Sequence, residues 1–79
     1  MPYIKSQDRG RAEFAPTNAG ELNFALTELI RFYWNNNRKY QTANDIIGAL
    51  ENCKLEFYRR VIMDYEDSKI VENGDVYNE

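Results

Sequence analysis

The chain has 79 residues, with one cysteine and no histidine, and it carries a formal net charge of −3. This composition excludes an intramolecular disulfide and any site built on histidine, and it leaves oligomerisation as the usual reinforcement for so small a domain. Apolar residues make up 43% of the chain, too many for a disordered protein. No apolar run is long enough to span a membrane and the start does not resemble a signal peptide, so we expect a cytoplasmic protein.

The negative charge is concentrated near the C-terminus. Residues 61–79 contain six acidic residues and one lysine, a net charge of −5. Residues 1–60 contain nine basic and seven acidic residues, a net charge of +2. Because an acidic end repels phosphates, we expect no nucleic-acid partner.

Residues 1–17 are predicted to form an arm with a short helix from Ser6 to Phe14, in which Ser6 is the cap. Gly10 and Pro16 interrupt any longer element. The few apolar side chains of this arm are expected to attach it to another part of the protein.

A helix is predicted over residues 18–35. Asn18 and Glu21 have the spacing of a capping box, in which each side chain accepts the backbone N–H of the other residue. The apolar residues that follow are spaced by four, three and four, which is typical of one helix face. They are Leu22, Leu26, Leu29 and Tyr33. The asparagines at 35–37 are expected to end the helix.

A longer helix is predicted over residues 42–73, with Thr42 as its cap and Gly74 as its stop, followed by an extended tail over residues 74–79. Its main apolar stripe is spaced by four, three, four and four residues. The stripe consists of Ile46, Leu50, Cys53, Phe57 and Val61. Its first part matches the stripe of the preceding helix, so the two helices are predicted to pack as an antiparallel hairpin with Cys53 in the core.

The long helix is longer than the preceding helix, so the hairpin cannot cover its whole length. At 1.5 Å per residue it is roughly 45 Å long, whereas the preceding helix is roughly 27 Å long. A second apolar stripe lies about 90–120° around the helix from the first and consists of Ile47, Tyr58, Ile62 and Tyr65. Trp34 and Phe32, which fall off the stripe of the first helix, are also expected at an interface. We therefore predict an all-α homo-oligomer, with a dimeric helical bundle as the expected form and packing of the arm on the second stripe as the alternative.

Residues that could perform chemistry are scarce. No histidine is present to activate Cys53, so we expect no catalytic residues, no enzymatic activity and no cofactor. The acidic residues Asp64, Glu66, Asp67 and Glu72 could attract a hard cation, but helical spacing separates them, and a solvated face without a metal site is the expected outcome.

One segment could bind a ligand. Arg59 and Arg60 follow Tyr58 and precede Tyr65, and an arginine pair beside aromatic rings could hold a phosphate and stack a base. The alternative is structural, because Arg60 has carboxylates four residues before and after it, at Glu56 and Asp64, and such pairs stabilise a helix.

Several segments match a known sequence pattern. They are the start MPYIK, the segment GELN at residues 20–23, the segment LEFYRR at residues 55–60, and the ending YED followed by ENGDVY. In these segments the chain resembles a family of short proteins of unknown function from bacteriophages, prophages and bacteria. The resemblance implies no catalytic residues.

Two functions are compatible with these features of the sequence. The first is a non-catalytic interaction or assembly protein of phage or prophage type, which binds itself and for which a host or phage protein is a further candidate partner. The second is a protein that sequesters a nucleotide-like small ligand at the subunit interface.

Overall fold

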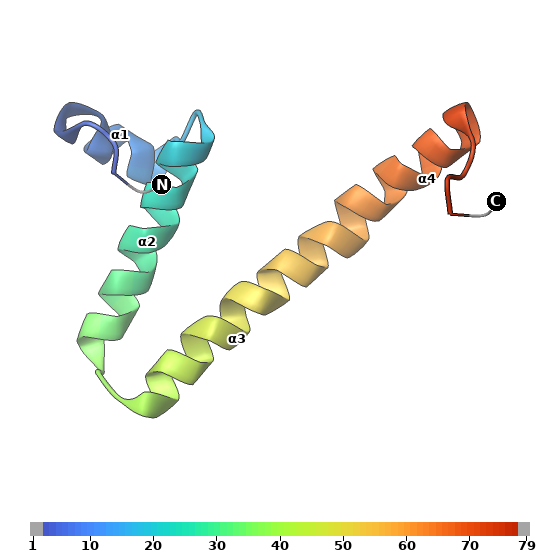
Figure 1. Cartoon of the computed structure of the whole chain (residues 1–79). Helices are drawn as coiled ribbons and strands as arrows, with labels where there is room; N and C mark the ends of the chain where they lie inside the picture. Colours follow the sequence, from blue (N-terminus) through green and yellow to red (C-terminus); the bar gives the residue numbers. More distant parts are fainter. Residues whose placement is uncertain (1–2, 78–79) are drawn as a thin grey trace. The chain divides into compact units, whose positions relative to one another are not determined.

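The computed structural model describes residues 3–77, and this range contains helices and turns but no β-strand (Figure 1). The predicted all-α class is therefore confirmed. The first two residues of the predicted arm and the last two of the predicted tail lie outside the described residues. The chain divides into two compact units, Met1–Ile46 and Ile47–Glu79, which are described in turn.

The predicted short helix is present in the arm. A single 3₁₀ turn, η1 (Ser6–Asp8), leads directly into α1 (Arg9–Phe14). The prediction that Ser6 caps this helix was wrong, because Ser6 already lies inside the 3₁₀ turn. The residue before it, Lys5, has an extended backbone and makes no side-chain cap bond.

The arm packs against the start of α2 (Ala19–Asn36), close to the predicted 18–35 (Figure 1). Ala12 of α1 is fully buried, and Phe24 of α2 is 7% exposed. The guanidinium of Arg9 lies 5.7 Å from the centre of the Phe24 ring, close enough for a cation–π interaction. Sequence periodicity missed this small core, since it placed Phe24 outside the apolar stripe. The four residues of the predicted stripe are all exposed.

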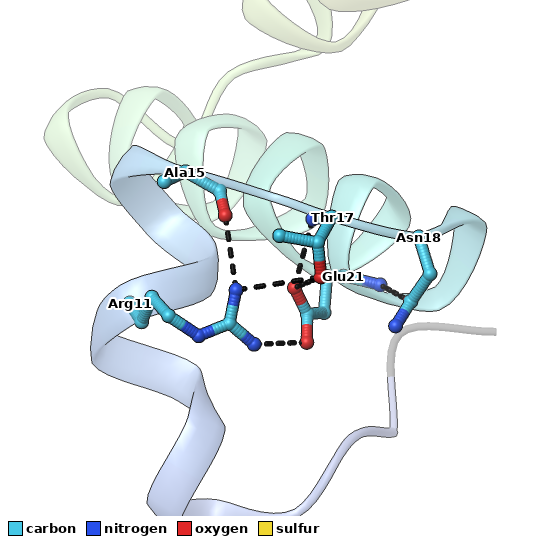
Figure 2. A network of polar contacts seen from close by, with 5 residues as sticks. All are labelled: Arg11, Ala15, Thr17, Asn18 and Glu21. Carbon is cyan, nitrogen blue, oxygen red and sulfur yellow. Dashed lines mark hydrogen bonds and ion pairs between the residues drawn. The ribbon is translucent and has the colours of Figure 1, made fainter.

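The Glu21 carboxylate holds the arm against the side of α2 that carries Phe24 (Figure 2). It accepts hydrogen bonds from the backbone N–H and the hydroxyl of Thr17, both at 2.9 Å, and it forms an ion pair with the Arg11 guanidinium. Arg11 also donates to the carbonyl of Ala15 at 3.1 Å. Residues 21 and 24 are three apart on one helix face, so the Arg11 bond brings α1 over Phe24.

The predicted capping box is half confirmed. The Asn18 side-chain oxygen accepts the backbone N–H of Glu21 at 2.9 Å, as expected. Glu21 does not return the bond to Asn18, however, but reaches one residue further back, to Thr17. In this position the Glu21 carboxylate accepts hydrogen bonds from Thr17 and pairs with the Arg11 guanidinium at the same time. These bonds, with that of Arg11 foremost, lower the pKa of Glu21 to about 2.

The turn after α2 is closed by its asparagines, as predicted. The backbone N–H of Asn37 bonds to the carbonyl of Trp34 at 3.1 Å. The Arg38 guanidinium donates two hydrogen bonds to the side-chain oxygen of Asn35, at 2.6 and 3.2 Å. The first of these bonds satisfies a carbonyl of the last helical turn, which has no partner within the helix.

The long helix consists of α3 (Tyr40–Phe57), η2 (Tyr58–Ile62) and α4 (Met63–Asn73), which follow one another without a break (Figure 1). It begins two residues before the predicted start. The Lys39 carbonyl accepts the first backbone bond, from Ala43 at 3.1 Å, so the helix is already formed at Thr42. Thr42 is therefore not a cap but a buried residue of the first turn.

Gly74 ends the long helix, as predicted. Its φ of 87° lies in the region that side-chain-bearing residues rarely adopt, and its N–H bonds to the carbonyl of Ile70 at 2.8 Å. The tail is not extended, because the side chain of Asp75 accepts the N–H of Tyr77 at 2.9 Å and closes a turn.

Candidate interaction surface on the long helix

The second unit, in its described part, is one helix followed by the turn after Gly74. Its apolar side chains therefore have no other helix of the unit to pack against. The large apolar side chains that are at least 37% exposed are Ile47, Leu50, Leu55, Phe57, Tyr58, Val61, Met63, Tyr65, Ile70, Val71, Val76 and Tyr77. Helices gain most of their stability from packing an apolar face, so this surface lacks a packing partner within its own unit.

The segment η2 is π-helical. In a π-helix each backbone N–H bonds five residues back instead of four, so each turn contains more residues than an α-helical turn. Apolar residues spaced by four drift by about 40° per step around an α-helix of 3.6 residues per turn. The wider turn counteracts this drift from Phe57 through Val61 to Tyr65. The three side chains are thereby kept close to one line along the helix.

We define the central stripe as Leu50, Cys53, Phe57, Val61 and Tyr65. Its four large side chains are between 37% and 61% exposed, and its cysteine is exposed as well. A shallow depression along this stripe is lined by Asn52, Cys53, Glu56, Phe57, Arg60 and Val61. Its lining shows that the stripe continues across the start of η2. Within its own unit Cys53 is exposed, contrary to the expectation that it is buried.

The four predicted ligand-binding residues all lie on this helix, but their polar groups point to different partners. Arg59 lies 3.5 Å from a carboxylate oxygen of Glu56, and Arg60 pairs with the other oxygen of the same group. Tyr58 instead donates to Glu66 at 3.3 Å. The two arginines and Tyr58 therefore turn to opposite ends of the segment, and their bonds do not bring them into one pocket.

Arg60 makes only one of its two predicted ion pairs. It bonds to Glu56 and not to Asp64. Side chains in a helix lean toward its N-terminus, and a glutamate four residues before a cation is the better order. Arg60 therefore pairs with the preceding carboxylate, Glu56.

The hydrogen bond between Tyr58 and Glu66 spans eight residues. The nearby Glu66 carboxylate raises the pKa of the Tyr58 phenol, first because its charge opposes formation of a phenolate and then because it accepts the phenol proton in a hydrogen bond. In a regular α-helix two residues eight apart differ by roughly 80° in direction. The π segment reduces this difference and allows the contact.

The predicted interface residues are distributed over both units. Phe32 and Ile47 are strongly exposed, Tyr58 and Tyr65 are about half exposed, and Ile62 and Trp34 are partly buried. The π segment changes the grouping within this set, because it moves Tyr65 from the second stripe onto the central stripe. Whether these residues contact a second subunit stays a prediction.

The acidic residues of α4 do not gather around a point. Within residues 3–77, no three carboxylate or thiol side chains lie close enough together to hold a metal ion. Lys69 lies 3.5 Å from Glu72 and 5.5 Å from the centre of the Tyr65 ring. No helix in the described range is both long and apolar enough to cross a membrane.

A family model described as "Domain of unknown function (DUF6899)" matches residues 1–76. The chain belongs to this family. No curated protein and no solved structure matches the chain. The DUF6899 match includes the arm, α2 and the long helix. It confirms the resemblance to a family of unknown function, while the phage or prophage origin stays a prediction.

Proposed function

We propose that this protein is a non-catalytic, self-associating helical protein that buries the central stripe in a homo-oligomeric bundle. The observation that carries the proposal is the exposure of that stripe on a helix whose unit offers no second helix to cover it. An exposed apolar surface of this kind is typical of protein–protein contact sites. The predicted helical hairpin, the origin in phages or prophages and the cytoplasmic location belong to the same proposal.

The first unit supplies further apolar surface for such a bundle. Leu22, Leu26, Leu29 and Tyr33 form a continuous stripe on α2, and each is at least 44% exposed. Only Ala12 and Phe24 are buried apolar residues in the described chain. A domain with so small a core is marginal alone, and burial against a second copy is the available reinforcement.

The test compares two substitutions on opposite sides of the long helix. Phe57 is 58% exposed on the central stripe, and Leu55 is 55% exposed about 160° away around the helix. Replacing either by aspartate adds one carboxylate at a similarly exposed site. We expect sedimentation equilibrium to give a multiple of the chain mass for the natural chain and for Leu55→Asp, but a monomer for Phe57→Asp, because burial of an unpaired charge is unfavourable.

Two results would contradict self-association through this stripe. One is a natural chain that is monomeric at tens of micromolar while circular dichroism reports the full helix content. The other is an equal effect of both substitutions, which would mean that the carboxylate acts through general destabilisation and not through the central stripe.

A second candidate function is sequestration of a nucleotide-like ligand by Tyr58, Arg59, Arg60 and Tyr65. The π segment favours it, since such segments occur frequently at functional sites. The pairing of both arginines with Glu56 argues against it, because a phosphate would have to displace that carboxylate. A thermal-shift scan against nucleotides tests this function. Stabilisation that is lost in Arg59→Ala would support it, and no shift with any nucleotide would exclude it.

A further inference from the structure

We infer that two copies of the long helix pair in antiparallel orientation, with Phe57 at the two-fold axis. This inference rests on the proposed self-association and adds its orientation and register. It follows from two independent features of the helix, the position of the apolar residues about Phe57 and the distribution of charge along the chain.

The central stripe is nearly symmetric about Phe57. Cys53 lies four residues before it and Val61 four residues after it, while Leu50 and Tyr65 lie seven and eight residues away. In an antiparallel pair centred on Phe57, each copy's Cys53 faces Val61 of the other, and each Leu50 faces the region of Tyr65. Every side chain of the central stripe then meets an apolar partner. An isologous contact of this kind is what two-fold symmetry requires.

The charges of the helix oppose a parallel pair. Residues 61–75, the acidic end, contain five acidic residues and one lysine, so their net charge is −4. Packed helices lie about 8–10 Å apart, which is close to the screening length of about 8 Å at physiological salt. A parallel pair would therefore place two segments of charge −4 side by side with incomplete screening.

The antiparallel register places each acidic end beside residues 39–53 of the other copy. That segment contains one lysine and two acidic residues, a net charge of −1. In this register Asp45 comes level with Lys69 of the second copy. No acidic residue of the acidic end comes level with an acidic residue of the second copy.

One like-charge pair remains in this register, because Arg60 comes level with Lys54 of the second copy. Each of these cations already has a carboxylate of its own chain. Arg60 pairs with Glu56, and Lys54 lies 3.7 Å from Glu51. Their mutual repulsion is thereby reduced, and the antiparallel pair still has less charge repulsion than the parallel pair.

Cys53, the only cysteine, makes the orientation measurable in the full chain. In a parallel pair in register, the two Cys53 residues face each other and can form a disulfide. In the antiparallel pair, they are separated along the axis by about eight residues, or roughly 12 Å. A disulfide requires Cα atoms no more than about 7 Å apart.

The experiment uses two chains, the natural one and the double variant Cys53→Ala/Val61→Cys. Each is oxidised mildly alone and after unfolding and refolding as an equimolar mixture, and the products are identified by intact mass under non-reducing conditions. Sedimentation of the reduced samples measures self-association separately. We expect dimers in sedimentation, no covalent dimer from either chain alone, and a covalent heterodimer in the mixture.

The other results overturn the inference in distinguishable ways. Covalent homodimers of each chain alone, with noncovalent dimers in sedimentation, would mean parallel pairing and would leave the proposed function intact. Noncovalent dimers without any cross-link would mean that a different surface pairs. Monomers in all reduced samples would remove the proposed function itself.

Discussion

At the residue scale, Glu21 has the most demanding role. Glu21 is 5% exposed. Its carboxylate links the start of α2, on which it lies, to α1 through Arg11 and to the connecting segment through Thr17. A hydrophobic contact could not replace these bonds, because an apolar side chain accepts no hydrogen bond from the N–H of Thr17 or from the Arg11 guanidinium. The junction between α1 and α2 therefore depends on ionisation of one carboxyl group.

This dependence predicts a specific response to pH. The pKa of Glu21 in the folded chain is about 2, compared with 4.5 for an unperturbed glutamate. A lowered pKa means that the ionised carboxylate stabilises the fold above pH 4.5 and that this stabilisation is lost as the pH falls toward 2. We expect Glu21→Gln to lower the melting temperature at pH 7 and to have progressively less effect between pH 4.5 and 2.

Fluorescence of Trp34, the only tryptophan, reports this melting because Trp34 lies in α2. Glu13→Gln is the matched control, since Glu13 is an exposed carboxylate of α1 for which no hydrogen bond or ion pair is found in the described chain. A pH-independent difference between the natural chain and Glu21→Gln would contradict the role given to the charge.

At the element scale, two glycines of the long helix should respond in opposite ways to alanine. Gly48 is inside α3 and is exposed, and apart from its chain neighbours and the backbone of its own helix no atom lies within 4 Å of the position that a Cβ would take. Gly48→Ala should stabilise the helix by about 0.5–1 kcal/mol. Gly74 has a φ of 87°, so Gly74→Ala should cost on the order of 1–3 kcal/mol and unravel the last turn.

Helix content from far-UV circular dichroism and the urea midpoint together check this pair. Gly48 lies on the side of the helix opposite Phe57, so its substitution leaves the central stripe unchanged. A loss of helix content in Gly48→Ala would mean that this side of α3 is also packed, and an unchanged Gly74→Ala would mean that the cap does not control the helix end.

Local signals were sufficient to predict the main elements. The cap at Asn18 and the stop at Gly74 depend only on residues within four positions of each other, so the sequence contains them directly. The ion pair between Arg11 and Glu21 joins residues ten apart across a loop, and no periodicity encodes it. The burial of Phe24 follows from that pair and was missed for the same reason.

The sequence predicted which apolar residues lie on the surface of the long helix, but it did not predict how they are grouped into stripes. A constant 100° per residue assigns Tyr65 to the second stripe. The π segment breaks that assumption, and the repeated spacing of four from Phe57 to Tyr65 was the signal that could have revealed it. The predicted ligand set was chosen by proximity in sequence, whereas Glu56 and Glu66 determine where the arginines and Tyr58 point.

At the scale of the whole molecule, folding and assembly should be coupled. A chain whose buried apolar residues in the described range are Ala12 and Phe24 gains little from its own core. If the central stripe completes the core, mass action stabilises the folded dimer as concentration rises. We expect the melting temperature to rise by on the order of 5 °C for each tenfold increase in chain concentration.

The control for this prediction is Phe57→Asp, whose melting temperature should not depend on concentration. Differential scanning calorimetry from about ten micromolar to one millimolar covers the necessary range. A natural chain with a constant melting temperature over that range would mean that each copy is stable without a partner.

The π segment also makes the long helix tolerant of the loss of one residue. A π turn is equivalent to one residue more than an α-helix needs over the same stretch. Deleting one residue between 58 and 62 would therefore restore a regular α-helix and keep the later side chains, including Tyr65, close to their present direction relative to Phe57. Among members of the family, a single-residue gap at this place would mark proteins whose long helix is regular and still presents the same stripe.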